Sequence, residues 1–327
     1  MKDSETHITI SSLPTKDQWV IFNLQETGYY RVNYDQDNWN LLIQQLLADH
    51  RVINTINRAQ IIDDAMDLAR AGQISYDVAL GLYSYLGNEV EYVPWKAAVN
   101  NLVYLRNMFY RTGGYGALKN YLLDMVVQLY DSVGFDNSLD DLLLEQYKRN
   151  TAVDWACKLG HKPCLDNVLN LYRQWMLNPH NETIISPNLK SVVYCRAMAA
   201  GGEEEWEFAW DRYLKSNVGS EKSRLLRAMG CTNKLWLLSS FGGKAKWYLI
   251  NSAMSNFNTE QQLKEVIDFE KKHRDDLDAA SRKVQQIIER TKNNMAWMDA
   301  NYQTIVNWLE QKGYSSKLRS VWVEPQP

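Results

Sequence analysis

Residues 19–39, WVIFNLQETGYYRVNYDQDNW, change from a strand-like pattern to a helical one within a single stretch. Apolar and polar residues alternate on both sides of the turn signal Thr27-Gly28. Such alternation predicts a β-hairpin. Asp35 and Asp37 then precede a helical pattern, where an aspartate can accept the first free backbone N–H groups. The stretch therefore predicts a junction between a β region and a helical region. The alternating apolar positions are Val20, Phe22, Leu24, Tyr30, Val32 and Tyr34.

The β region expected in residues 1–34 is small. Together with the run 7–11, the hairpin gives about three strands, fewer than a self-sufficient sandwich needs to bury both of its faces. Residues 1–34 therefore look like the tail of something larger. Unpaired strand edges and an apolar face predict that this segment packs on the first helices or mediates self-association.

The remaining residues, 35–327, show helical periodicity in segments of about 12 to 20 residues. Helices of this length joined by short turns pack as antiparallel pairs, so the predicted fold is mainly α. We expect a superhelical array, a bowl of the HEAT or armadillo kind, although no strict sequence repeat accompanies it. The expected helices cover residues 58–70, 75–86, 94–109, 138–159, 163–176, 189–200, 203–215, 222–229, 260–272 and a long segment from 277 past 308.

The composition of the chain argues against a nucleic-acid-binding protein and against a membrane-spanning one. Hydrophobic residues make up 45% of the 327, enough for a large core, and the net charge of −3 offers no basic surface for nucleic acid. No apolar run has the roughly 18 residues that a membrane span needs. The first residues, MKDSETHITI, do not resemble a signal peptide, and the last, VWVEPQP, do not resemble a lipid-anchor signal. We therefore expect no transmembrane segment, leader or anchor in this chain.

Four cysteines lie in the middle third of the chain, at Cys157, Cys164, Cys195 and Cys231. They lack the CxxC spacing of a zinc ribbon or a thioredoxin motif. Gly160 and Pro163 turn the chain between the first two, which brings them within reach of a disulfide. Two disulfides and four buried free thiols both fit these residues. One triplet, Asn181-Glu182-Thr183, is an acceptor sequence for N-glycosylation and weak evidence of secretion.

Motifs of catalysis are missing from the sequence. No two histidines lie one helical turn apart, so the zinc motif HExxH cannot be built from His7, His50, His161, His180 and His273. No GxSxG elbow, P-loop or dinucleotide fingerprint occurs. Cys164 with His161 is a weak nucleophile and base candidate, because a cysteine opening a helix is more often structural. Asp63-Asp64 fits a solvated pair, or a pair with one member capping a neighbouring turn, better than a catalytic pair, because adjacent helical residues point about 100° apart. We predict no catalytic and no metal-binding residue.

Three segments carry a resemblance to a known family: GYYRVNYDQDNW (28–39), NRAQIIDDAMDLARAG (57–72) and NMAWMDANYQTIVNWL (294–309). In this order they resemble the C-terminal region of aminopeptidase N and its relatives, the gluzincin zinc aminopeptidases. The resemblance implies that residues 1–34 are the remnant of a small β-sandwich domain and that residues 35–327 form a bowl of HEAT-like helix pairs. It also implies two disulfides, Cys157 with Cys164 and Cys195 with Cys231.

The same resemblance implies a function for the chain. Family members carry the motif GAMEN and HExxH in domains before the sandwich, and neither occurs here. The expected function is therefore a non-catalytic lid, inactive alone, that covers the zinc site of a secreted or cell-surface aminopeptidase and shapes its peptide chamber. Implied partners are the catalytic domain, which holds the zinc, peptides in the chamber and a second copy in a homodimer. The alternative is a free-standing helical solenoid that binds peptides or proteins without enzymatic activity, or a scaffold for oligomerisation.

Overall fold

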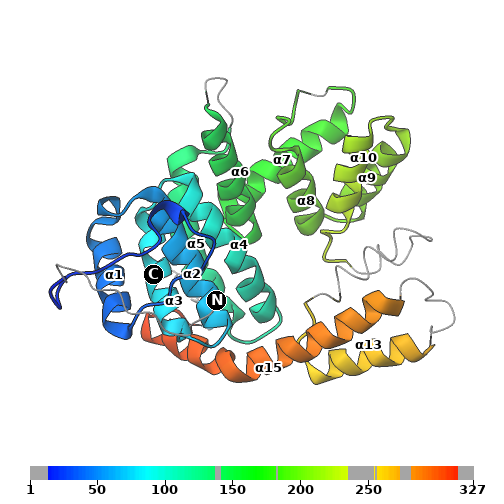
Figure 1. The fold of residues 1–327 in the computed structure, drawn as a ribbon. Helices are drawn as coiled ribbons and strands as arrows, with labels where there is room; N and C mark the ends of the chain where they lie inside the picture. The colour runs from blue at the N-terminus through cyan, green and yellow to red at the C-terminus, as the bar shows by residue number, and fades with distance from the viewer. Residues whose placement is uncertain are drawn as a thin grey trace, which may run out of the picture.

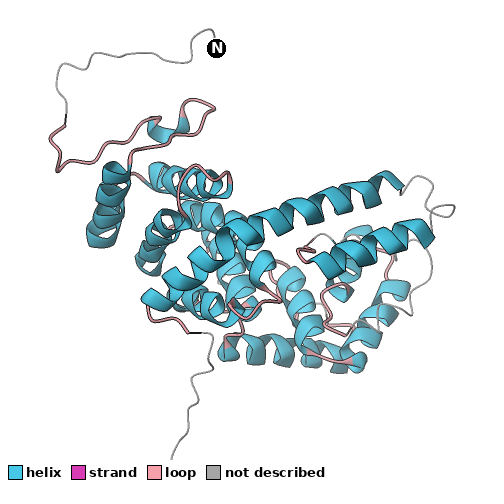
Figure 2. Ribbon diagram, turned by 90° about the horizontal axis from the view of Figure 1, so that it is seen from below, coloured by secondary structure: helices cyan, strands magenta, loops and turns pink. Residues whose placement is uncertain are grey.

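The computed structural model is mainly helical in the part of the chain that it describes, residues 14–136, 141–181, 183–234, 254, 256–272 and 281–315 (Figure 1). Figure 2 shows helices and loops but no strand in this part. The helices are α1 (Gln36–Asp49), α2 (Thr55–Arg70), α3 (Tyr76–Tyr83), α4 (Tyr92–Phe109), α5 (Tyr115–Val133), α6 (Leu143–Lys158), α7 (Lys162–Leu177), α8 (Lys190–Ala200), α9 (Glu203–Lys215), α10 (Gly219–Met229), α13 (Glu260–Lys272) and α15 (Ser281–Gln311).

Most of these helices group into two blocks (Figure 1). In the first block, α2 packs against α3 and α4, and α15 contacts α3 and α5. We define the first block as α1–α5 with α15. In the second block, α7–α10, helix α8 packs against α7 and α10, and α9 packs against α10. Helix α6 connects the blocks, because it contacts α4 and α5 on one side and α7 and α8 on the other.

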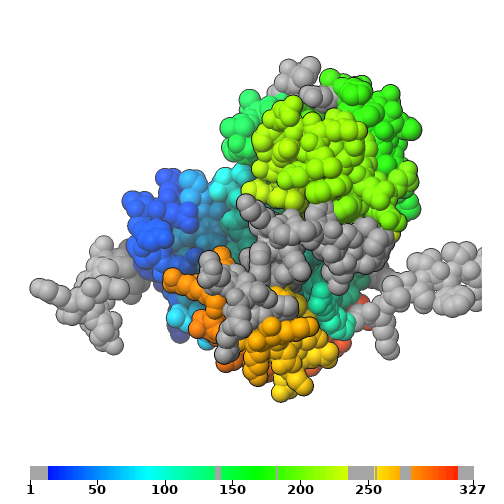
Figure 3. All heavy atoms as spheres, turned by 90° about the vertical axis from the view of Figure 1, so that its right-hand side faces the viewer, coloured from blue at the N-terminus to red at the C-terminus, as the bar shows by residue number. Residues whose placement is uncertain are grey.

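The hydrophobic core is continuous through both blocks. Its largest fully buried side chains include Trp39, Trp95, Tyr76, Tyr83 and Phe109. Helix α13 belongs to a separate small cluster in which Val266 packs against Val284, Ile287 and Ile288 of α15. Figure 3 shows the molecule from the side, with α9 and α10 at the top and α13 with the start of α15 at the bottom.

Helix starts follow the polar signals of the sequence. The Asp35 side chain accepts the backbone N–H of Asn38 at 2.8 Å, so it caps α1 as expected. Ser75 caps α3 by accepting from the N–H of Asp77 at 3.2 Å. Each cap satisfies one of the donors that the first helical turn leaves free, which explains why the helices begin at these residues.

The predicted hairpin is wrong in the described residues 14–34, which form loops and one 3-10 turn, η1 (Leu24–Glu26). Positive φ angles of 57° at Asn23 and 56° at Gln25 are incompatible with an extended strand there. The backbone N–H and C=O of Val20 bond the side chain of Asn38 in α1 instead of a second strand. Of the alternating apolar side chains only Val32 is buried, whereas Phe22, Leu24 and Tyr30 are exposed, so the alternation marks neither a paired strand nor a buried face. The strand expected at 7–11 lies outside the described residues.

Other boundaries differ by a few residues. Helix α4 begins at Tyr92, so Pro94 is its third residue and not its first. Helix α6 begins at Leu143, and part of the start expected from 138 lies outside the described residues. The start expected at 277 for the long last helix also lies outside them, and α15 is described from Ser281. The superhelical, HEAT-like bowl stays a prediction.

Candidate functional site

A broad groove between α2, α4 and α15 is the largest hollow that we describe. Its cavity volume is about 770 Å³. Two of the segments that resembled the aminopeptidase family meet in it, because 57–72 contributes the end of α2 and 294–309 contributes the middle of α15. The lining residues are Arg70, Ala71, Gly72, Tyr104, Gln286, Glu289, Arg290, Asn293, Asn294, Ala296, Trp297, Ala300 and Asn301.

Aromatic rings form the floor of this groove. Trp297 of α15 packs edge to face with Tyr76 and with Tyr104, at 5.4 Å between ring centroids in both pairs. Its indole Nε1 donates a hydrogen bond of 3.1 Å to the hydroxyl of Tyr76. Burial raises the pKa of both tyrosines, so both stay neutral and hydrogen-bonding at physiological pH. These contacts fix α15 against α3, which carries Tyr76, and against α4, which carries Tyr104.

Charged and amide side chains line the rest of the groove. The Arg70 guanidinium lies 3.9 Å from the centre of the Tyr104 ring, a cation–π contact that holds it at the surface. Glu289, Arg290 and Asn293 are exposed along α15. Carboxamides both donate and accept hydrogen bonds, and arginine binds carboxylates, so this surface matches the chemistry of a peptide main chain and its charged ends. Sequence reasoning assigned no binding role to these residues.

The segment before α1 is fixed to α2 by charge. Arg31 donates to Asp63 at 2.8 Å and to Asp64 at 3.1 Å, and it also pairs with Asp67 one turn further along α2. The backbone N–H of Val32 donates to Asp64 at 3.1 Å. Burial raises the pKa of Asp64, and the Arg31 charge opposes that rise. Of the two interpretations of Asp63-Asp64, a solvated pair is wrong for Asp64, whose side chain is only 7% exposed. Its bond to the Val32 N–H is closer to the alternative, in which one member caps a neighbouring segment.

The four cysteines form two disulfides with the pairing that the resemblance implies. Cys157 of α6 bonds Cys164 of α7, with 5.2 Å between their Cα atoms. Cys195 of α8 bonds Cys231, which follows α10, with 5.3 Å between Cα atoms. No cysteine is free, so Cys164 does not act as a nucleophile with His161 in this structure. Both disulfides tie helices of the second block to a neighbour.

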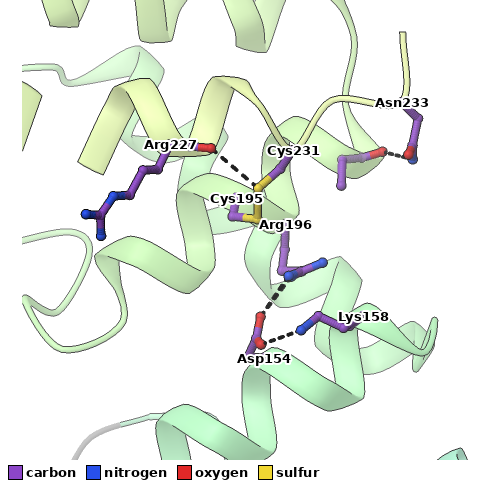
Figure 4. The surroundings of a disulfide bond; sticks show 8 residues. Asp154, Lys158, Cys195, Arg196, Arg227, Cys231 and Asn233 are labelled. Carbon is purple, nitrogen blue, oxygen red and sulfur yellow. Dashed lines mark hydrogen bonds and ion pairs between the residues drawn. A yellow bond between two sulfur atoms is a disulfide. The ribbon is translucent and has the colours of Figure 1, made fainter. Parts of the chain in front are cut away.

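An ion-pair network lies beside the second disulfide (Figure 4). Asp154 of α6 accepts from Lys158 at 2.9 Å and from Arg196, the neighbour of Cys195, at 3.0 Å. Burial alone would raise the pKa of Asp154, but Arg196 and Lys158 together lower it below its usual value. The network therefore joins α6 to α8, and with them the connecting helix to the second block.

The glycosylation triplet lies in the loop between α7 and α8. Asn181 is exposed, and its Oδ1 accepts the backbone N–H of Thr183 at 3.0 Å and the Thr183 hydroxyl at 2.7 Å. This is an Asx-turn, in which the asparagine side chain replaces a backbone group. Asn181 also lines a second, smaller cavity between α7, α8 and α10.

Metal ligands do not gather in the described part of the chain. Within it, no three side chains of His, Cys, Asp and Glu lie close enough to hold one ion. His50, His161 and His180 are separate from one another in the fold, and His7 and His273 lie outside the described residues. No described helix is both long and apolar enough for a bilayer crossing.

Comparison with known proteins identifies the family. The family model for the ERAP1-like C-terminal domain matches residues 19–245. The chain belongs to the ERAP1-like C-terminal domain family. The match begins at Trp19, the first residue of the stretch in which the sequence predicted a junction between a β region and a helical region. The matched residues cover α1–α10.

Full-length relatives of this ERAP1-like C-terminal domain are aminopeptidases by name. The chain is 34% identical to aminopeptidase Ey of Gallus gallus, over 91% of its own length and 36% of that protein. It is 33% identical to aminopeptidase N of Homo sapiens over 90% of its length, again with 36% of the relative covered. Aminopeptidase N of Plutella xylostella is 35% identical over 66% of the chain. The chain spans little more than a third of the length of the Gallus gallus and Homo sapiens proteins and 23% of the Plutella xylostella protein. The comparisons do not favour a free-standing module.

Proposed function

We propose that this chain is the non-catalytic C-terminal lid of a zinc aminopeptidase. The observation that carries the proposal is the family match over residues 19–245 together with similarity to aminopeptidases over about 90% of the chain. In this proposal, the helices cover the active site of the catalytic domain and form a wall of the chamber that admits peptides. The catalytic domain is the principal partner.

The groove between α2, α4 and α15 is our candidate for the peptide-facing surface. Its carboxamides offer donors and acceptors to a main chain, and Arg70 and Arg290 offer positive charge to a carboxylate. Its width suits transient contact with many sequences, because no deep apolar pocket selects a side chain. A chamber wall of this kind would hold peptides weakly near the catalytic site.

Zinc does not fit the residues that the structure describes. The sequence lacks HExxH, and the described His, Cys, Asp and Glu side chains form no group of three. A zinc hydrolase needs three protein ligands and a base that activates the metal-bound water. We therefore place the metal and the catalytic residues in the remainder of the parent enzyme and assign no catalytic step to this chain.

We further propose that the chain resides outside the cell or at its surface, with a glycan on Asn181. Two disulfides suit an oxidising compartment. The exposed Asx-turn at Asn181 leaves its Nδ2 without a hydrogen bond to any described residue, so that nitrogen is accessible for modification. We also propose that two copies of the parent aminopeptidase form a homodimer through this domain.

An activity assay tests the central claim. The purified chain, supplied with zinc, is incubated with amino-acid anilides, and release of the coloured amine is followed. We expect no turnover above a zinc blank, because the chain supplies neither metal ligands nor a base. Turnover that a chelator abolishes, and that persists through further purification, would contradict the proposal.

A further inference from the structure

The small cavity next to Asn181 has a volume of about 260 Å³ and lies between α7, α8 and α10. This is below the roughly 300 Å³ at which pockets for drug-sized ligands begin, so it has room for one small ring and not for a chain of them. We propose that it is a binding site for the first sugar of a glycan attached to Asn181. The proposal rests on the glycosylation proposed above.

The position of Asn181 is the first argument. Asn181 is itself part of the cavity lining, so a group attached to its Nδ2 starts at the cavity and needs no further partner to reach it. The Thr183 contacts hold Oδ1 and thereby fix the plane of the carboxamide. Attachment joins Nδ2 to C1 of an N-acetylglucosamine; Nδ2 loses one proton, and the lipid diphosphate carrier leaves with the electron pair of its bond to C1. The sugar is then tethered at high effective concentration.

The chemistry of the lining is the second argument. A saccharide ring has apolar C–H faces and a rim of hydroxyl groups, so its sites combine apolar contacts with charged and amide side chains. Here Trp175 and Ile185 are buried beneath the cavity, and Val218 contributes an apolar side chain that is 59% exposed. Asn217 and Arg212 add hydrogen-bonding groups beside them. An attached sugar would cover Val218 and remove that apolar area from water.

The polar groups of the cavity are built into the fold. Glu221 accepts from the Tyr194 hydroxyl at 2.7 Å and from Arg224 at 2.5 Å, and Lys190 lies 4.0 Å away. Tyr194 in turn stacks on Trp175, with 4.8 Å between ring centroids. In contrast, no carboxylate of the described residues pairs with Arg212. Arg212 therefore has donors available for sugar hydroxyl or acetamido oxygens.

The experiment compares glycoforms of the full chain secreted from a eukaryotic host. Mass spectrometry first measures occupancy at Asn181 in the parent sequence, in Thr183→Ser, which keeps the acceptor triplet, and in Thr183→Ala, which destroys it. An endoglycosidase then trims the glycan to a single N-acetylglucosamine. We expect the trimmed form to keep the full thermal midpoint of the untrimmed protein. We expect the unglycosylated form to melt about 2 °C lower, since one lost contact of this kind shifts a domain of this size by that amount.

A second variant separates the cavity from a general effect of glycosylation. Arg212→Ala should lower the midpoint of the glycosylated chain but leave the unglycosylated Thr183→Ala background unchanged, because without the sugar the guanidinium pairs with no carboxylate of the described residues. Lys215→Ala, on the same helix and paired with exposed Asp211, is the matched control and should act equally in both backgrounds. An unoccupied Asn181 would overturn this inference and the proposed glycan together. Full occupancy with no coupling to Arg212 would overturn only the cavity site.

Discussion

The first block buries its polar groups, whereas the second block is cross-linked. In the first block, Arg58 of α2 pairs with Glu89 at 2.7 Å, and the two side chains are 5% and 0% exposed. The second block has no ion pair so deeply buried among the described residues, and it contains or borders both disulfides. The two blocks share one hydrophobic core, so the difference lies in what supplements it.

The number of residues that each helix buries explains the difference, because α7 has 16 residues like α2 but buries only four. Helices α9 and α10 have 13 and 11 residues and bury three residues each. Helix α2 has 16 residues and buries 11, including Arg58 and Asp64. Because less apolar surface leaves water when a helix buries few residues, such a block gains less free energy from packing, and a cross-link supplies a larger share of its stability. The comparison teaches that buried polar contacts supplement the core in the first block, whereas disulfides supplement it in the second.

Replacing Glu89 should have the largest effect and tests the first half of the comparison. Glu89→Ala leaves the Arg58 guanidinium buried without its carboxylate, and it also removes the acceptor of the N–H groups of Val90 and Glu91. Breaking a buried pair by removing one partner costs about 3 to 5 kcal/mol of unfolding free energy. Denaturant unfolding followed by circular dichroism measures the loss.

An exposed ion pair provides the control for Glu89. Lys215 lies 2.8 Å from Asp211, and the side chains are 65% and 47% exposed. Lys215→Ala should cost less than about 1 kcal/mol, because water already screens this pair. Equal losses for the two variants would show that burial does not distinguish the Arg58–Glu89 pair.

Removing the long-range disulfide tests the second half of the comparison. Cys195→Ala with Cys231→Ala opens a loop of 36 residues, and the chain-entropy argument gives a loss of up to about 4 kcal/mol. The matched control is Cys157→Ala with Cys164→Ala, whose separation of seven residues gives about 2.5 kcal/mol. Thermal unfolding and thiol titration of both variants check the order. A larger loss for the short loop would mean that packing around the sulfur atoms, and not loop length, decides the effect.

The sequence predicted the helices because their signals are local. Asp35 and Ser75 cap helices where expected, and the turn between Cys157 and Cys164 separates α6 from α7 as Gly160 and Pro163 indicated. Such signals act over a few residues, so a short segment of the sequence contains them completely. The family of the chain was also recognisable, because 28–39, 57–72 and 294–309 occur in a characteristic order.

The sequence could not predict features that depend on distant partners. Alternation around Val20 looks the same whether its backbone pairs with a second strand or with a side chain, and here Asn38 of α1 bonds both the N–H and the C=O of Val20. The groove needs Arg70 and Trp297, which are more than two hundred positions apart. No periodicity relates such residues, so only their packing reveals the site. The burial of Asp64 beside Arg31 has the same cause.

Asp154 lies in α6, the helix that connects the two blocks, and its replacement has the smallest predicted effect on stability. Asp154→Asn should lower the unfolding free energy at neutral pH by about 1.5 to 3 kcal/mol, the range for hydrogen bonds to charged groups. Arg196 and Lys158 lower the pKa of Asp154 in the folded state. A lowered pKa means that this stabilisation is complete above the ordinary aspartate pKa of 3.8 and disappears as the pH falls through the folded-state value.

The difference between the parent chain and Asp154→Asn should therefore be constant from pH 7 to about pH 5 and shrink below pH 4. Denaturant unfolding at a series of pH values measures it. Asp166→Asn serves as the control, because Asp166 contacts Lys162 on the surface, with side chains 58% and 81% exposed, and its replacement should change stability little at any pH. A difference for Asp154→Asn that persists unchanged at pH 3 would show that the carboxamide loses packing and not charge. In that case, packing of the Asp154 side chain, and not its charge, would stabilise the contact between α6 and α8.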